Sequence, residues 1–371
     1  MNTNKKRTDD IYTYLKFRGD LEFKNAPLNE VDALILSELA YIHFENIVPG
    51  VGEKGSISLK EASEKYISKE GKESIFYARY ERLLETVAEC PRYGQLQLSN
   101  YVSVIEQENQ QQFSAIHIQI NPFLTFVAFR GTDETLVGWR EDFNMSYMMP
   151  VPAQISAVEY VNKTARGLFQ KYYIGGHSKG GNLAIYSSVF CDSCVQNNIK
   201  EVYNFDGPGF HKKIVDNDAY LRIKDRIHSF VPEASVVGML MEHEEDYRVV
   251  KSYEIALMQH EGLTWSVDGT KFETVETTDE FSNSLQTMLK SWLEKADYND
   301  RKVMVNTLFD VWEIGGIRTV LDFKDVSVHG TTAMIKAAAT LPKEQREIIT
   351  HLIKIWISES KKTVVNAIKG E

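Results

Sequence analysis

A serine in a glycine-rich segment has the setting that most clearly predicts chemistry. Residues 176–180, Gly-His-Ser-Lys-Gly, fit the pattern G-x-S-x-G, which places a serine nucleophile on a sharp turn between a strand and a helix. Such a turn strains the backbone at the serine and demands small neighbours, which Gly176 and Gly180 supply. A β-type run precedes the segment and a helical run, 182–189, follows it. We expect Ser178 to be a nucleophile; the alternative is an ordinary glycine turn.

A nucleophilic serine needs an oxyanion hole, because its attack on a carbonyl creates a negatively charged oxygen. One N–H donor follows the nucleophile, and another comes from an earlier strand-end loop. Residues 126–132, Phe-Val-Ala-Phe-Arg-Gly-Thr, are an apolar run that ends in such a loop. We expect the N–H groups of Lys179 and Thr132 to form the hole, with the Thr132 hydroxyl as an additional donor. The alternative is a hairpin end without a catalytic role.

The general base is expected after Ser178, because the chain order in this arrangement is Ser, acid, His. His260 lies in the loop-like segment Gln-His-Glu-Gly that follows the last expected core strand, and it is our candidate. His177 is expected to be structural, since adjacent strand-end residues point apart. The other histidines after Ser178 are placed in a turn, a strand, a charged run expected to be solvated, or the C-terminal helices: His211, His228, His243, His329 and His351.

Together these segments resemble a known group of enzymes. The AFRGT and GHSKGG segments are similar to the class 3 lipase branch of the α/β-hydrolases. The closer resemblance, over about residues 28–270, is to the Mbeg1-like family of bacterial proteins, and four further segments carry it: 129–133 (FRGTD), 138–142 (GWRED), 204–210 (NFDGPGF) and 259–265 (QHEGLTW). The resemblance implies an α/β-hydrolase fold, with Ser178 as nucleophile and Thr132 as oxyanion residue, and leaves the substrate open.

Two carboxylates are candidates for the acid that orients the histidine. Asp206 ends the strand after the serine turn, in the compact segment Asp-Gly-Pro-Gly, and Glu233 ends the next strand. An alignment on the class 3 lipase pattern favours Glu233. We favour Asp206, because the glycines beside it allow a close approach, although a turn-forming Asp is the alternative reading.

A group of polar and aromatic residues lies near the expected oxyanion loop: Asp133, Trp139, Glu141 and Asp142. These residues either order the loop and line the pocket, or form a capped turn with a packed tryptophan. We do not expect them to bind a metal, because adjacent carboxylates on one helix point in different directions.

The elements that must position these residues alternate along the chain. Residues 113–120 and 125–129 predict a hairpin, and strands then alternate with helices up to about 231, which predicts a parallel sheet covered on both faces. After about residue 272 only helical periodicity is seen, over about 280–295, 299–313, 330–339 and 343–367. We expect a polar arm over residues 1–27, an α/β-hydrolase domain with a mostly parallel sheet over 28–272, and a helical extension over 273–371.

Composition limits the partners and the compartment. The chain has 371 residues, 43% hydrophobic and 25% charged, with a net charge of −10, which argues against nucleic acid as the main partner. No apolar run is long enough to span a bilayer, and no apolar signal core follows the basic N-terminus. Three cysteines, Cys90, Cys191 and Cys194, indicate a reducing cytosol rather than a disulfide framework. The oligomeric state has no signal in the sequence.

These observations predict a cytoplasmic serine hydrolase that cleaves carboxylic esters, with lipid or acyl esters as candidate substrates, through an acyl-enzyme. Ser178 attacks, His260 transfers the proton, and Asp206 or Glu233 orients His260, without a cofactor. Two alternatives are a thioesterase, amidase or acyltransferase, and a catalytically silent module with this fold that binds a partner.

Overall fold

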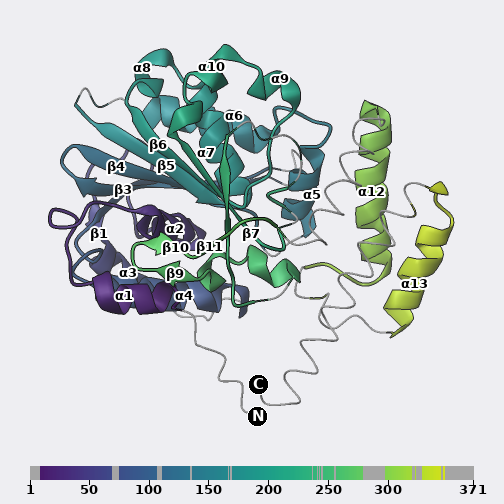
Figure 1. Ribbon diagram of the computed structural model, residues 1–371, viewed down its shortest axis with the longest axis horizontal. Coiled ribbons are helices and arrows are strands. Elements are labelled where there is room, and N and C mark those ends of the chain that lie inside the picture. Colours follow the sequence, from purple (N-terminus) through teal and green to yellow (C-terminus); the bar gives the residue numbers. More distant parts are fainter. Residues whose placement is uncertain are drawn as a thin grey trace, which may run out of the picture.

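A large mixed sheet organises the chain (Figure 1). The structure is a computed structural model, and it describes residues 9–68, 75–106, 111–133, 136–278 (other than 166, 168, 236, 240, 242, 244 and 255), 297–319, 322, 328–343 and 346. In this part of the chain nine strands form the sheet, in the order β1 (Ile57–Ser58), β2 (Gln97–Glu106), β3 (Gln111–Asn121), β4 (Leu124–Phe129), β5 (Lys171–His177), β6 (Ile199–Phe205), β7 (Ile227–Pro232), β8 (Tyr247–Val250) and β11 (Thr274–Val275).

The sheet is mixed, with one continuous run of parallel strands. The strands from β4 to β8 run parallel, whereas β1 to β4 and the pair β8–β11 are antiparallel. The expected hairpin is confirmed, since β3 and β4 pair through Ala115 and Phe129 among others. The expectation of helices alone after residue 272 is wrong at β11, whose two residues are too few to show a period of two.

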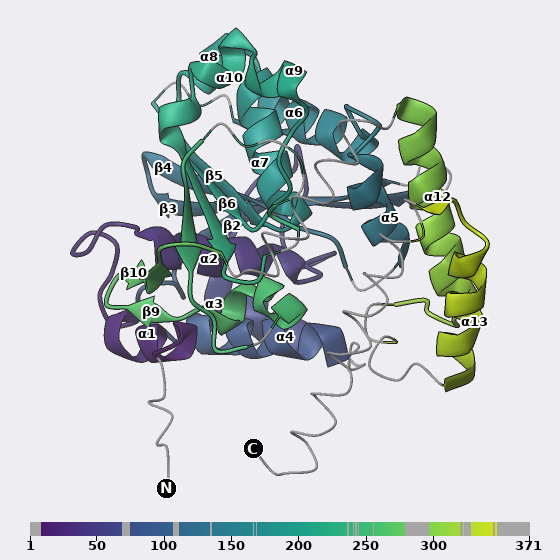
Figure 2. The ribbon, with the colours of Figure 1, turned by 45° about the vertical axis from the view of Figure 1, so that its right-hand side comes forward.

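Helices cover both faces of the sheet (Figures 1 and 2). One face packs against two helices that follow β4 and β5 in the chain, α6 (Pro152–Thr164) and α7 (Lys179–Phe190), through an apolar cluster that contains Phe129, Val161 and Leu183. The other face is covered by the N-terminal helices: α1 (Ile11–Arg18), α2 (Glu30–Glu38), η1 (Leu39–Tyr41), α3 (Leu59–Ile67) and α4 (Ile75–Ala88). The short pair β9 (Val267–Asp268) and β10 (Lys271–Phe272) lies on that same side.

Part of the N-terminal segment, expected to be a polar arm, packs into the core of the protein. Residues 11–18 form α1, and Ile11, Tyr14 and Leu15 are buried in the core under the sheet. Their spacing puts them on one helix face, while the charged residues around them dominate the average composition of residues 1–27. The next helix, α2, begins as expected at Asn29, whose side chain accepts hydrogen bonds from the N–H groups of Val31 and Asp32.

Two helices of the C-terminal part lie beside the sheet rather than on either face. They are α12 (Tyr298–Ile314), which lies next to α5 (Leu136–Asn144), and α13 (Val328–Ala339), which lies next to α12 (Figures 1 and 2). Phe309 and Trp312 of α12 make edge contacts with Phe143 of α5. The helix expected over 280–295 lies outside the described residues, as does most of the one expected over 343–367. Among the described helices, none is long and apolar enough to cross a membrane.

Several short helical elements lie between α7 and β9 in the chain. After α7 come α8 (Ser193–Gln196), α9 (Lys212–Val215), α10 (Asp218–Leu221), η2 (Lys224–Arg226), η3 (Ala256–His260) and η4 (Gly262–Thr264). All three cysteines are free, with Cys191 buried at the end of α7 and Cys194 exposed in α8.

Candidate active site

Ser178 occupies the sharp turn between β5 and α7. Its backbone has φ 57° and ψ −133°, a conformation that a non-glycine residue adopts only where the surroundings impose it. Gly176 and Gly180 permit the turn, because a side chain on Gly176 would collide with the backbone of Gly180. The helix begins at Lys179, so its N-terminal N–H groups gather around the serine.

Three side chains that are distant in sequence meet at this turn. Nε2 of His260 lies 3.0 Å from Oγ of Ser178, and Nδ1 of His260 lies 2.6 Å from Oδ2 of Asp206. His260 ends η3, and Asp206 follows β6, the strand that pairs with β5. Serine, imidazole and carboxylate thus stand in a continuous line of hydrogen bonds, the arrangement in which a serine can lose its proton to the imidazole.

Asp206 is fully buried and held by donors. Its Oδ1 accepts hydrogen bonds from the Ser235 hydroxyl at 2.5 Å and from the N–H of Gly238 at 3.1 Å, which leaves Oδ2 for His260. Its backbone also has a positive φ, 52°. Glu233, the other candidate, follows β7, and its N–H donates to the carbonyl of Val250. The carboxylate that accepts from Nδ1–H of His260 is therefore that of Asp206.

The loop after β4 lies against the serine turn, as an oxyanion loop must. Gly131 packs so closely that a side chain there would lie 3.1 Å from Cβ of Ser178 and collide with the carbonyl oxygen of His177. The Thr132 hydroxyl differs from the expectation of an additional oxyanion donor, because it donates to Oδ2 of Asp142 at 2.7 Å. The carboxylate therefore fixes the loop that carries the N–H of Thr132.

A buried ion pair lies directly behind the nucleophile. Nζ of Lys179 donates to Oε2 of Glu141 at 2.6 Å, and both side chains are almost completely inaccessible. Glu141 also accepts from the N–H groups of Gln112 and Ala153. Glu141 and Asp142, neighbours on α5, thus contact the two segments that bear the expected oxyanion donors: Glu141 contacts the residue after the nucleophile, and Asp142 contacts Thr132.

Burial changes the acidity of Asp142. Loss of hydration raises the pKa of this carboxyl to about 7, against the opposing influence of the Lys179 charge and the Thr132 hydrogen bond. Among the described residues, no three or more His, Cys, Asp or Glu side chains form a group that could hold a metal ion. The reading in which these acids order the loop is the one that the contacts support.

Two polar groups near the site had no clear signal in the sequence. His243 and Glu245, expected in a solvated charged run, are buried, with Nδ1 of His243 3.2 Å from Oε1 of Glu245. Although burial favours its neutral form, the interaction with His243 lowers the pKa of Glu245 to about 2. Glu245 also accepts a hydrogen bond from Ser229 on β7. This pair secures the chain that follows Ser235 and Gly238, the two donors to Asp206.

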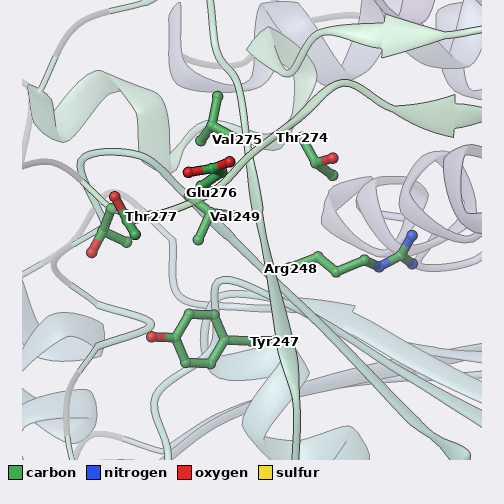
Figure 3. Close-up of a pocket in the computed structure, with 8 residues that line it drawn as sticks. Tyr247, Arg248, Val249, Thr274, Val275, Glu276 and Thr277 are labelled. Carbon is green, nitrogen blue, oxygen red and sulfur yellow. The ribbon is translucent and has the colours of Figure 1, made fainter.

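A hollow at the sheet edge lies apart from this site. It has a volume of about 440 Å³ and is lined by residues of β8 and of the segment that includes β11 (Figure 3): Tyr247, Arg248, Val249 and residues 274–278. Figure 3 shows the Arg248 side chain extending away from the other labelled residues, and its guanidinium donates to Glu30 at 2.7 Å. The lining does not include Ser178, Asp206 or His260. The hollow therefore gives no information about the substrate of these residues.

Comparison with known proteins places the site in a family. Residues 87–310 match the model of the Mbeg1-like family. No curated protein matches the chain. Among solved structures, the chain is similar to the Rhizomucor miehei lipase in its propeptide complex (13% identity, 56% of this chain and 67% of that chain, TM-score 0.34) and to M37 lipase (15% identity, 43% of this chain and 63% of that chain, TM-score 0.32).

Proposed function

The chain belongs to the Mbeg1-like family, and we propose that it is a serine hydrolase that cleaves carboxylic esters. The observation that carries the proposal is the hydrogen-bonded line from Ser178 through His260 to Asp206. Its support is the strained serine turn at the start of α7, where N–H groups converge on the place at which an oxyanion would form. The arrangement suits acyl transfer, because it contains a nucleophile, a base, an acid that orients the base, and N–H donors for the oxyanion.

In the proposed reaction, Oγ of Ser178 attacks the acyl carbon while Nε2 of His260 accepts its proton. The negative charge moves to the carbonyl oxygen, where the N–H groups of Lys179 and Thr132 stabilise it. Asp206 keeps the proton of His260 on Nδ1 and stabilises the imidazolium. His260 then protonates the leaving alcohol, and water attacks the acyl-enzyme by the same route, which restores the free serine and releases the acid.

We also propose that the fold is that of an α/β-hydrolase. The parallel run from β4 to β8, with the serine turn after β5 and the acid after β6, supports that assignment. We also propose the division into a hydrolase domain over about 28–272 and a helical extension from 273. Residues 11–18 of the expected polar arm belong to the core instead, since α1 packs into it.

The decisive experiment is covalent labelling with a fluorophosphonate, followed by intact-mass and peptide analysis. The wild-type protein should gain one adduct on Ser178, and the Ser178→Ala protein should gain none. Ser187, buried in the middle of α7, provides a matched control, because Ser187→Ala removes a serine of the same helix without touching the turn. A folded wild-type protein that stays unlabelled contradicts the proposal. Turnover of matched ester, thioester and amide substrates then tells which leaving group the enzyme prefers.

A further inference from the structure

The N-terminal helices reach the candidate active site. Most of their residues precede 87, where the match to the family model begins. Tyr41 ends η1, and its hydroxyl lies 3.2 Å from Nδ1 of His177, the residue before the nucleophile. The same hydroxyl packs against Gly131 of the loop after β4, and the Tyr41 ring stacks on Tyr80 of α4 at 4.5 Å. One side chain thus contacts both the serine turn and the expected oxyanion loop.

His177 in turn holds the backbone of the candidate base. Its Nε2 lies 2.6 Å from the carbonyl oxygen of His260, and the two imidazole rings have centroids 4.7 Å apart. A carbonyl oxygen only accepts hydrogen bonds, so Nε2 of His177 must carry a proton. Burial, with the charge of His260 as a smaller influence, lowers the pKa of His177 well below its usual value, so the ring is neutral. Its Nδ1 is therefore bare and accepts from the Tyr41 hydroxyl.

Glu38 keeps this tautomer in place by being uncharged. Its carboxyl is completely buried, with Oε1 3.6 Å from Nδ1 of His177. Burial, together with the nearby charge of Glu261, raises the pKa of Glu38 well above its usual value. An ionised Glu38 would draw a proton to Nδ1 of His177 and replace the Tyr41 hydrogen bond. The neutral carboxyl leaves the line from Tyr41 to His177 intact.

A second link attaches the same loop to α4. The guanidinium of Arg79 forms an ion pair with the carboxylate of Glu261, the residue after His260. Glu261 is mostly buried, so the pair is shielded from solvent. The backbone on each side of the His260 side chain is therefore fixed by a different element, by β5 through His177 at the carbonyl of His260 and by α4 through Arg79 at the next residue.

We infer that His177 is a positioning residue for the proposed hydrolysis, which holds His260 in line with Ser178 through its carbonyl oxygen and is itself oriented by Tyr41 of the N-terminal helices. This inference rests on the proposed function and assigns the N-terminal helices a part in the same site. His177 contacts neither the substrate nor the reacting atoms. It acts on the position and orientation of the His260 imidazole relative to Oγ of Ser178. A displacement of a catalytic group by about 1 Å costs on the order of a hundredfold in rate.

The test compares His177→Leu with His177→Gln. The leucine removes the donor to the carbonyl of His260, whereas the amide nitrogen of glutamine stands near the position of Nε2 and restores it. We expect kcat for an ester to fall by roughly 10–100-fold in the leucine protein with little change in KM, and most of it to return in the glutamine protein. His228→Leu is the matched control, since His228 is a half-exposed histidine on β7, paired with Glu201.

Two further measurements separate a positioning role from a structural one. The acidic limb of the pH dependence of kcat/KM should move in His177→Leu, and the downfield proton resonance of the His260–Asp206 hydrogen bond should weaken or shift. Tyr41→Phe, which removes only a hydroxyl, should change the acidic limb and the proton resonance in the same direction as His177→Leu. If the leucine protein does not fold, Tyr41→Phe serves as the test variant.

The outcomes for the two proposals are distinct. If wild-type protein labels with fluorophosphonate while folded His177→Leu and Tyr41→Phe keep the wild-type kcat, pH profile and proton resonance, the positioning role is wrong and the hydrolase stands. If the wild-type protein does not label, the hydrolase assignment fails, and this inference fails with it.

Discussion

Oδ2 of Asp206 and Nδ1 of His260 lie 2.6 Å apart, although 54 residues separate them in the chain. Asp206 follows the strand next to the serine strand, and His260 returns to it at the end of η3. The carboxylate is completely buried and accepts two further hydrogen bonds, from Ser235 and from Gly238. Both of these donors bind Oδ1, so Oδ2 is the oxygen that faces His260.

The first prediction concerns this carboxylate. Asp206→Asn should lower turnover of an ester by roughly 10²–10⁴, because an amide in that place favours the wrong tautomer of His260 while Ser178 remains present. Glu233→Gln should stay within a few-fold of the wild-type rate. Steady-state kinetics of both proteins under one set of conditions decides the matter. If Glu233→Gln loses most of its turnover and Asp206→Asn keeps a nearly normal rate, the choice of Asp206 is wrong and the lipase alignment, which favours Glu233, is right.

The proximity of Ser178, Asp206 and His260 could be anticipated from the sequence, because local patterns place these residues at neighbouring strand ends. The serine turn requires glycines at fixed positions, and the chain order of acid and base follows from the order of the strands. The glycines beside Asp206 favoured it over Glu233 but could not decide between the two. The donors that hold its carboxylate, Ser235 and Gly238, come from a loop whose path no local pattern reveals.

The parts that the sequence did not predict depend on contacts between distant elements. His243 and Glu245 looked solvated because their neighbours are charged, yet they pair with each other inside the protein. The helix α1 was not predicted, because it lies in a charged segment. The three residues that it buries scarcely change the average hydropathy of that segment. The strands β2 and β8 went unnoticed because half-exposed strands in a mixed sheet have irregular patterns of burial.

The second prediction concerns the ion pair behind the nucleophile. Lys179→Met leaves Glu141 buried without its partner, which should lower the free energy of unfolding by about 3–5 kcal/mol. Adding Glu141→Gln removes the unpaired charge but keeps an oxygen for the N–H groups of Gln112 and Ala153. The double variant should therefore be more stable than Lys179→Met alone. Denaturant unfolding of the four proteins of this cycle measures the coupling, and strictly additive effects would contradict a direct pair.

The third prediction concerns pH and Asp142. The pKa of this carboxyl is about 7 in the folded protein and near 3.8 in the unfolded chain, so the folded state holds the proton more tightly. Its contribution to stability is complete below about pH 4 and is lost as the pH rises towards 7. Asp142→Asn cannot ionise and should lose less stability than the wild type over that range. Thermal unfolding of both proteins at several pH values tests this, and parallel curves would refute it.

The fourth prediction concerns the helix that packs against α5. Trp312 and Phe309 of α12 are almost fully buried, and both contact Phe143. Trp312→Ala should lower the free energy of unfolding by about 3–5 kcal/mol, the usual cost of removing a large buried aromatic side chain. Ile314→Ala, at an exposed position on the same helix, should cost less than 1 kcal/mol and serves as the control.

The effect of such a substitution on activity shows whether α12 only supports α5 or takes part in catalysis. The described residues of α12 contribute nothing to the line of Ser178, His260 and Asp206, but α5 carries Asp142, which binds the Thr132 hydroxyl. A weakened α12 should therefore slow hydrolysis modestly, through the oxyanion loop, and leave Ser178 able to react with fluorophosphonate. A chain ending near residue 275 exposes Phe143 and should show the same pattern more strongly. Complete loss of labelling in a folded Trp312→Ala protein would instead require α12 to be part of the catalytic machinery.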